Sequence, residues 1–241
     1  QLGYAEADPS FDINGNDAAH KLALLARLAF GMGNCIDNIY MQGISEITIA
    51  DIEHADQLGF VIKHLGLANK ADNGYQLGVY PALVDKQHLL ANVTGVLNAV
   101  MAQGDYLGEY VATGAGAGGN ATASAVVADI MQVASLVDND NYNHTSPLYV
   151  AAASVASDKV LDINLSTNAY YLRISHGTQP ADAIEQLLLN NKIAIEKSIN
   201  NALETVIISK PVVEETFNQA VANLQQQETI TQVISLRVAT F

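Results

Sequence analysis

Apolar residues recur at three- and four-residue spacing along the segment Ala18–Phe30 and so predict an amphipathic helix. The members of its apolar face are Leu22, Leu25, Ala26 and Ala29. Gly31 and Gly33 follow at once and mark its end, because glycine adopts the left-handed conformation that often closes a helix. A shorter helix is predicted over Asp51–Leu58, closed in the same way by Gly59.

The next pattern is typical of strands. Phe60–Gly66 and Gln76–Val84 are apolar runs on either side of the turn Lys70–Gly74, whose Asn-Gly pair tolerates positive φ. Val93–Val100 and Asp105–Thr113 are expected to complete this sheet-forming region. The mixture of helices with strands that have hairpin-like connections predicts an α+β fold with a mixed sheet for the front of the chain.

The glycine-rich segment 114–119 precedes a second long helix, which is predicted over Thr122–Val137. The polar segment Asp138–Pro147 then favours a domain boundary. We therefore divide the chain into a domain over 1–140, a linker over 141–166 and a second domain over 167–241.

The second domain has a compact pattern. Strand, helix, strand, strand, helix and strand follow one another, over Tyr170–Ser175, Pro180–Asn190, Ala194–Asn200, Glu204–Ser209, Val212–Gln226 and Thr231–Val238. This βαββαβ order predicts a ferredoxin-like fold, in which two helices cover one face of an antiparallel sheet.

Composition narrows the class of protein. With 241 residues, 49% of them hydrophobic, the chain can bury a core in each domain. Cys35 is the lone cysteine, which excludes an internal disulfide framework, and no apolar run approaches the ~20 residues that span a bilayer. The chain starts at Gln1 without a charged and apolar leader, so we expect a cytoplasmic protein that begins inside a longer one.

Charge argues against nucleic acid as a partner. The formal net charge is −14, and residues 1–140 carry 5 Lys and Arg against 16 Asp and Glu. Phosphate contacts need clustered basic residues, which this chain lacks.

The segment Glu6–Lys21 combines four acidic residues with one lysine. Ser10, Asp12 and Asn14 alternate ahead of a glycine, which loosely matches a calcium loop. The last position of such a loop must supply a bidentate carboxylate, and Lys21 stands there instead. Calcium is therefore disfavoured.

A surface turn and a catalytic cluster both remain open for this segment. In the first interpretation Asn14 or Asn16 caps the helix, and Asp17 lies near the positive end of its dipole. In the second, Asp17 and Lys21 project from one helix face, and the loop before them folds further acids towards them; these acids are Glu6, Asp8 and Asp12. Neighbouring acids and burial together tune a lysine for proton transfer.

The glycine-rich segment Gly114–Gly119 matches G-x-G-x-x-G. A dinucleotide-binding unit also needs a second strand that ends in an acid, and no apolar strand follows the helix here. Close packing of glycine backbone against a neighbour, such as a cofactor held by another domain, fits better. The histidines at 20, 54, 64, 88, 144 and 176 show no ligand spacing, so no metal site is predicted.

Several segments together resemble the homoserine dehydrogenase family. The first, Leu2–Leu25, follows the family signature G-Y-x-E-x-D-P-x-x-D-x-x-G-x-D-x-x-x-K. Similar matches continue in the same order through Gly43–Thr48, Leu97–Val100 and the glycine-rich segment with its helix. From Tyr170 the chain resembles the regulatory ACT domain that many of these enzymes carry.

The resemblance implies an NAD- or NADP-dependent oxidoreductase that interconverts L-homoserine and L-aspartate 4-semialdehyde in threonine and methionine biosynthesis. By the family pattern, Lys21 exchanges the proton of the substrate hydroxyl. Asp17 orients that hydroxyl and the lysine, and Glu6 binds the substrate ammonium. Tyr4 and Asp12 match pocket residues.

The same resemblance implies where a cofactor and partners would bind. It assigns a segment to the nicotinamide side of the cleft, made of Gly114, Gly116, Gly118 and Thr122. It also implies a homodimer formed through the sheet region, and L-threonine as an effector of the ACT domain.

Two departures limit what this chain can do. The family's N-terminal NAD(P)-binding domain does not precede the signature here, so we expect the chain alone neither to bind NAD(P) tightly nor to turn over homoserine. The ACT effector loop usually reads D-x-P-G, whereas His176–Asp182 differs, which leaves control by threonine open. A non-enzymatic amino-acid sensor with a dimerising front domain is the alternative function.

Overall fold

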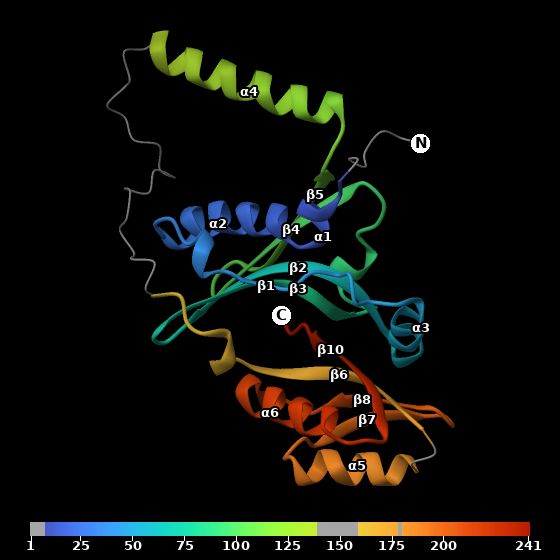
Figure 1. The fold of residues 1–241 in the computed structure, drawn as a ribbon. Helices are drawn as coiled ribbons and strands as arrows, with labels where there is room; N and C mark the ends of the chain where they lie inside the picture. Colours follow the sequence, from blue (N-terminus) through green and yellow to red (C-terminus); the bar gives the residue numbers. More distant parts are fainter. Residues whose placement is uncertain (1–7, 139–158, 178–179) are drawn as a thin grey trace.

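The structure, a computed structural model, describes residues 8–138, 159–177 and 180–241 (Figure 1). It is an α+β protein with a mixed sheet, which confirms the predicted fold class. The helices are α1 (Ser10–Ile13), α2 (Asn16–Phe30), α3 (Ile49–Leu58), α4 (Gly119–Asp138), α5 (Ala181–Asn190) and α6 (Glu214–Gln225). Short 3-10 helices are η1 (Ile36–Asn38), η2 (Leu89–Asn92) and η4 (Ile163–Leu165).

One sheet of eight strands joins the front of the chain to its end. Its main path runs β1-β3-β10-β6-β8-β7, with β2 paired to β3 and β9 to β6. The strands are β1 (Tyr40–Met41), β2 (Phe60–Ala71), β3 (Gly74–Asp85), β6 (Thr167–His176), β7 (Ile195–Asn200), β8 (Glu204–Ser209), β9 (Val212–Val213) and β10 (Ile230–Val238). The two-residue strands β1 and β9 were not predicted, because such short segments carry no periodic signal.

The hairpin β2–β3 is the scaffold of the front part. Its two strands pair without interruption from Phe60 opposite Asp85 to Ala71 opposite Gly74, so the predicted hairpin is confirmed and is longer than expected. The Asn-Gly pair at its turn tolerates positive φ, but neither Asn73 nor Gly74 adopts it. Gly74 meets a different demand: a β-carbon there would lie 2.3 Å from the carbonyl oxygen of Lys159.

A second, separate sheet consists of β4 (Leu97–Gly104) and β5 (Gly108–Ala115), which pair only with each other among the described residues. Both segments were expected to be strands that complete the sheet-forming region of β2 and β3; they are strands, but they form a sheet of their own. The hairpin instead packs its inner side chains on the β3–η2 region; these side chains are Ala99, Met101 and Val111. It is thus attached by side-chain packing rather than by backbone hydrogen bonds.

The end of the chain has the predicted βαββαβ order. Its four main strands lie in the order β10-β6-β8-β7, all antiparallel, with α5 and α6 on one face (Figure 1). The core between these helices and the sheet is mainly apolar and includes Tyr170, Leu172, Ile184, Leu188, Phe217 and Leu224. This part is called the C-terminal module below.

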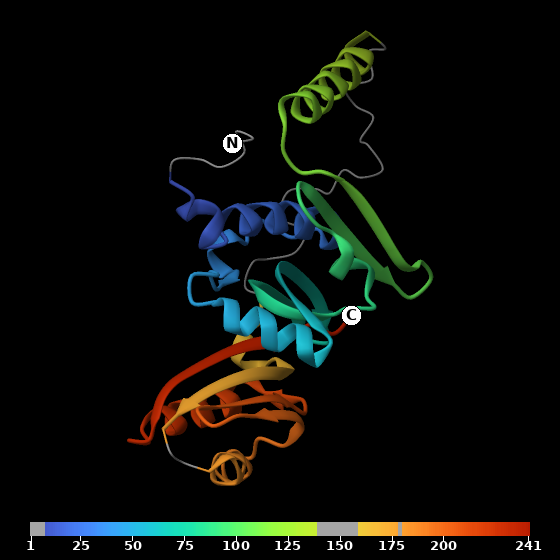
Figure 2. The same cartoon turned by 90° about the vertical axis from the view of Figure 1, so that its right-hand side faces the viewer.

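The other face of that sheet packs on the front of the chain. Tyr171, Val206 and Leu236 form one buried cluster with Ala55 and Leu58 of α3. In addition, β10 pairs in parallel with β3, with Arg237 opposite Ala82 and Val238 opposite Leu83. Figure 2 shows the C-terminal module below α3 and the β2–β3 hairpin.

The predicted linker over 141–166 is described only from residue 159 onward. There Leu161 donates its backbone N–H to the Tyr75 carbonyl oxygen at 2.8 Å, and Val160 forms a β-bridge with Tyr75. The described end of this segment therefore lies against the front part of the protein. The division of the chain into two domains stays a prediction.

The helix α4 stands away from both sheets (Figures 1 and 2). Its apolar side chains are exposed, among them Val126, Val127, Ile130, Met131 and Val133. A 20-residue helix of this composition is stable in water only when an apolar face is covered.

Candidate active site

The helix α2 begins at a glycine rather than at an asparagine. Its N-cap is Gly15, with φ of 87°, and no side chain caps it; Asn14 ends α1 and Asn16 is already helical. The predicted Asn14 or Asn16 cap is therefore wrong. The reason is tertiary: a β-carbon at position 15 would lie 3.0 Å from Val79 Cγ1, so the turn needs both positive φ and an absent side chain.

The predicted ion pair between Asp17 and Lys21 is present. Lys21 Nζ donates to Asp17 Oδ2 at 2.5 Å, one turn inside the helix. Both side chains are reachable from solvent, being 57% exposed for Lys21 and 41% for Asp17. A charge-assisted hydrogen bond of this kind holds the Lys21 ammonium in one direction.

The surface around this pair is apolar. The opposite side of α2 is buried through Ala19, Leu22 and Ala26, which pack on the β2–β3 hairpin. On the open side, Leu24 is 64% exposed and Leu28 57% exposed, so Lys21 is bordered by apolar surface. Leu25 is also exposed, so the predicted apolar face is only half buried.

The remaining acids of the opening segment have different surroundings. Glu6 and Tyr4 lie outside the described residues. The Asp8 carboxylate accepts hydrogen bonds from the Ser10 hydroxyl at 2.6 Å and from its backbone N–H at 3.0 Å, which lowers the pKa of Asp8. Asp12 is exposed on α1. The described structure thus joins Asp17 to Lys21, while Asp8 is engaged in its own turn.

The glycine-rich segment leads from β5 into α4. Gly116 packs closely, since a β-carbon there would lie 2.2 Å from Asn98 Nδ2, and its N–H donates to the Val96 carbonyl oxygen at 2.9 Å. Gly118 has φ of 124°, and the Thr122 N–H donates to its carbonyl oxygen at 3.0 Å. At Gly114 no atom lies within 4 Å of such a β-carbon, so its backbone is open to approach.

This geometry also bears on the dinucleotide-binding pattern. The strand before the glycines, β5, pairs antiparallel with β4 and belongs to a two-stranded sheet. A dinucleotide-binding unit needs parallel strands joined by the helix. The G-x-G-x-x-G match therefore does not make an independent dinucleotide-binding unit in the described residues.

Two buried ion pairs at the junction of the two parts were missed by sequence reasoning. Arg173 on β6 donates to Asp51 of α3 at 2.7 Å, and Tyr171 donates to the same carboxylate at 3.0 Å. Arg237 on β10 donates to Glu214 at the start of α6. All four charged side chains are at most 6% exposed. The only sequence signal was a charge inside each apolar strand.

Hydrogen bonding sets the charge state of the first pair. Burial alone would raise the pKa of Asp51, but hydrogen bonds from Arg173 and Thr48 outweigh it and hold the pKa below its usual value. Thr48 and Asp51 also form a capping box, with the Asp51 carboxylate accepting from the Thr48 N–H at 2.9 Å. Asp51 is therefore an ionised structural group.

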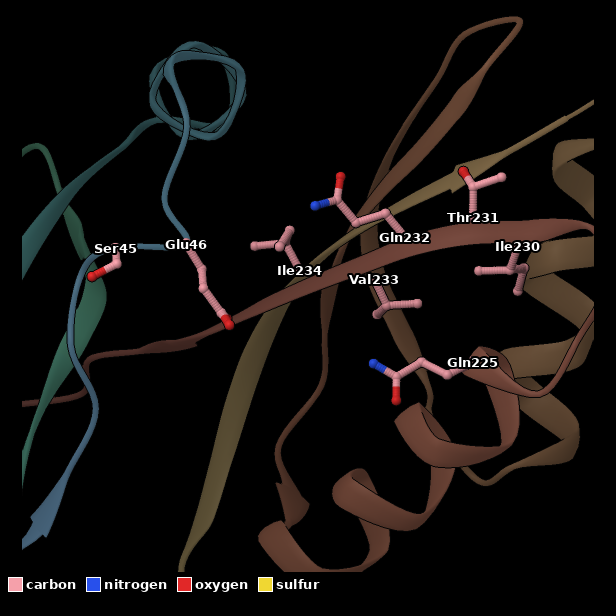
Figure 3. A pocket seen from close by; sticks show the side chains of 8 residues that line it. All are labelled: Ser45, Glu46, Gln225, Ile230, Thr231, Gln232, Val233 and Ile234. Atoms are coloured by element: carbon pink, nitrogen blue, oxygen red, sulfur yellow. The ribbon is translucent and has the colours of Figure 1, made fainter.

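Two hollows in the described part of the chain lie away from the Asp17–Lys21 pair. One of about 580 Å³ separates the loop that carries Ser45 and Glu46 from the edge of β10, and Figure 3 shows Glu46 pointing toward that strand. Its other lining residues are Gln225 and the β10 residues 230–234. Neither it nor a second, apolar hollow beside β2 includes Asp17 or Lys21.

Among the described residues, no group of three or more His, Cys, Asp or Glu side chains could hold a metal ion. No helix of that part of the chain is both long and apolar enough to cross a membrane.

Comparison with known proteins gives consistent matches. A sequence model of the homoserine dehydrogenase family matches residues 1–131. Homoserine dehydrogenase of Pseudomonas aeruginosa is 40% identical over 98% of this chain and 57% of its own length. That of Neisseria gonorrhoeae is 39% identical over 98% of this chain and 56% of its own length.

The solved structures agree with the sequence matches. A homoserine dehydrogenase structure from Thiobacillus denitrificans superposes with a TM-score of 0.86 at 36% identity, covering 99% of this chain and 56% of that one. One from S. aureus gives 0.73 at 27% identity, covering 100% of this chain and 56% of that one. The chain thus spans a little over half the length of these relatives.

Proposed function

The chain belongs to the homoserine dehydrogenase family, and from that premise we propose that it supplies the substrate-binding and proton-transfer half of an NAD(P)-dependent oxidoreductase. The reaction proposed is the interconversion of L-homoserine and L-aspartate 4-semialdehyde, in cytoplasmic threonine and methionine biosynthesis. The observation that carries the proposal is the hydrogen-bonded, solvent-reachable pair Asp17–Lys21 at the start of α2.

The charges of this pair suit the proton-transfer step. When the aldehyde is reduced, the carbonyl oxygen gains negative charge and takes a proton, which the Lys21 ammonium can donate. In the reverse direction the neutral amine takes the hydroxyl proton. Asp17 holds the ammonium in one direction through the 2.5 Å hydrogen bond, so the proton is delivered from a defined position.

Acids in the opening segment suit the substrate's other charged group. Homoserine carries an ammonium, and carboxylates are the side chains that bind one most strongly. We assign this role to Glu6, with Asp12 and Tyr4 in the same pocket. Asp12 is exposed on α1 and free to face a substrate that lies over the start of α2.

The cofactor would be NAD or NADP, which supplies or accepts the hydride. The fit in this chain is partial: the backbone at Gly114 is open to a flat ring, whereas the space at Gly116 is filled by Asn98. We therefore assign Gly114, Gly118 and Thr122 to the nicotinamide side of the cleft and give Gly116 the role of closing the β4–β5 hairpin. Tight cofactor binding is assigned to the part of the relatives that this chain does not cover.

The apolar surface around Lys21 and on α4 supports the proposal of a half-cleft. Leu24, Leu28 and Ile130 are each more than half exposed, which is unfavourable unless another surface covers them. Water excluded from Lys21 in this way would strengthen its interaction with the developing charge.

We also propose two partners for the protein. A second copy would cover the outer face of the β4–β5 hairpin, where Val100 is 47% exposed and Tyr110 56% exposed. A monomer in sedimentation would contradict the proposed dimer.

L-Threonine would bind the C-terminal module as an effector. Absence of heat on titrating the 241-residue chain with millimolar L-threonine would contradict this binding.

The central experiment replaces Lys21 in the full-length protein that contains this chain. For Lys21→Ala we expect kcat to fall about 10²- to 10⁴-fold, the usual contribution of a positioned acid or base. The unfolding midpoint should stay unchanged, since an exposed pair contributes little to stability. Steady-state reduction of L-aspartate 4-semialdehyde and thermal unfolding measure the two quantities.

The matched control is Lys86→Ala. Lys86 Nζ lies 2.6 Å from Asp56 Oδ1 in another exposed lysine–aspartate pair, which has no proposed role in the reaction. Lys86→Ala should keep wild-type kcat. Wild-type activity in both variants would defeat the assignment of Lys21, whereas a full-length wild type without this activity would favour the non-enzymatic sensor.

A further inference from the structure

A partly buried histidine lies against the start of α2. His64 is the fifth residue of β2, opposite Pro81 of β3. A β-carbon on Gly15 would lie 3.2 Å from His64 Cε1 and 3.3 Å from its Nε2, so the ring packs against the backbone of the α2 N-cap. Asp17 and Lys21 follow that N-cap by two and six residues.

His64 also holds the neighbouring loop. Its Nε2 lies 3.1 Å from the Gln42 carbonyl oxygen, and since a carbonyl only accepts, Nε2 carries the hydrogen. Burial lowers the pKa of His64, more than this hydrogen bond raises it, so the ring is neutral. The donor is therefore directed at one backbone oxygen of the loop.

The same loop supports the turn between α1 and α2. The Ile44 N–H donates to the Ile13 carbonyl oxygen at 3.1 Å, and a β-carbon on Gly43 would lie 2.9 Å from that oxygen. The loop and the turn are thus in backbone contact. A shift of the loop by a few tenths of an ångström must move the turn with it.

The other end of this loop is anchored to the C-terminal module. Gln42 Oε1 accepts from Arg237 Nη1 at 3.1 Å. The Arg237 guanidinium lies over the rings of both Tyr40 and Tyr80, 4.7 and 4.4 Å from their centroids, and is ion-paired with Glu214. The Gln42 side chain is therefore fixed by a rigid group, and its carbonyl by His64.

We propose that His64 is a positioning residue for the Asp17–Lys21 pair. It acts in two ways: its ring supports the Gly15 backbone, and its Nε2–H holds the Gln42 carbonyl, so that α2 starts at a fixed place and angle. The proposal rests on the function proposed for Lys21. His64 touches neither substrate nor cofactor in this scheme.

Activity assays on the full-length protein give the first test. His64→Leu fills a similar volume without a donor, and we expect kcat to fall ten- to a hundredfold, the scale of a misplacement near 1 Å, with KM for NAD(P)H unchanged. His64→Gln restores an N–H donor and should recover most of that loss. A wild-type kcat in His64→Leu would overturn the proposal.

Stability measurements separate positioning from a merely structural role. His54→Leu on α3 is the matched control, a second partly buried histidine, whose Nδ1 has no hydrogen-bond partner in the described part of the chain. We expect His54→Leu to keep wild-type kcat, and His64→Gln to recover kcat more than it recovers the unfolding midpoint. Loss of activity that merely follows loss of folded protein across all three variants would overturn the proposal.

Hydrogen–deuterium exchange on the 241-residue chain gives a readout independent of catalysis. In His64→Leu the amides of residues 16–22 should exchange faster, whereas those of α5 should be unchanged. Unchanged exchange at residues 16–22 would defeat the role of His64 even if Lys21 proves essential. Faster exchange there, with full activity in Lys21→Ala, would instead defeat the proposed function and leave the support of α2 by His64 standing.

Discussion

The protein contains two kinds of ion pair, and their surroundings give them different uses. Asp17–Lys21 lies on the open side of α2, with side chains 41% and 57% exposed. Asp51–Arg173 and Glu214–Arg237 lie at the junction of the two parts, with side chains at most 6% exposed. An exposed pair four residues apart contributes ~0.3–0.5 kcal/mol to stability, whereas removing one partner of a buried pair costs about 3–5 kcal/mol.

This contrast separates an ion pair that is suited to proton transfer from ion pairs that stabilise the fold. The exposed pair can change its protonation and partners with little effect on the fold, as a proton-transfer site requires. The buried pairs cannot, because a charge left alone there has neither water nor a partner. The three predictions below test this difference.

The largest effect on stability is expected at Glu214. Its carboxylate accepts from Arg237 and from the Tyr170 hydroxyl at 2.5 Å, so Glu214→Ala leaves a buried guanidinium without its counter-charge. We expect the free energy of unfolding to fall by about 3–5 kcal/mol in urea titrations. Glu215→Ala, at the next and exposed position of the same helix turn, is the control and should change it by less than about 0.5 kcal/mol. Equal effects of the two would remove the contrast.

A smaller and pH-dependent effect is expected at Asp51. The folded pKa of Asp51 is lowered, so its ionised form adds stability that is fully present above the unfolded pKa of about 3.9 and is lost as pH falls through the folded pKa. Asp51→Asn should therefore be less stable than the wild type near neutral pH. The difference should shrink below about pH 4. Urea unfolding from pH 7 to pH 2 measures it, and a difference that stays constant down to pH 2 would show that the carboxylate charge is not what matters.

The smallest effect on stability is expected at Asp17. Asp17→Asn removes the charge but keeps the shape, so unfolding free energy should change by no more than about 0.5 kcal/mol, and less in 1 M salt. The kcat of the full-length enzyme should nevertheless fall at least about tenfold, because the Lys21 ammonium is no longer held in one direction. A large loss of stability with unaltered kcat would invert the comparison between the two kinds of pair.

Much of the fold could be predicted because its signals are local. The period of α2, the pairing of β2 with β3 in a hairpin and the βαββαβ order of the C-terminal module all follow from spacings within a few residues. The Asp17–Lys21 pair was predictable for the same reason, since residues four apart on a helix share a face.

Other features could not be read from local spacing. The N-cap of α2 is Gly15 rather than an asparagine, because Val79 and His64 crowd the position from another strand. The β4–β5 hairpin forms its own sheet because it is attached through its inner side chains, which pack on the β3–η2 region. Its strands do not pair with β3 through backbone hydrogen bonds. Each of these outcomes depends on a contact between segments distant in sequence.

The sequence by itself determined the helices other than α1, most strands, the family and the chemical types at the candidate site, because periodicity and motif spacing are properties of neighbouring residues. Only the tertiary structure decided that β10 joins β3, that Arg173 meets Asp51 across 122 positions, and that His64 lies beneath Gly15. In each of these contacts the two partners are distant in sequence. They meet only because the packing of the whole sheet brings the strand edge or the buried charge next to its partner.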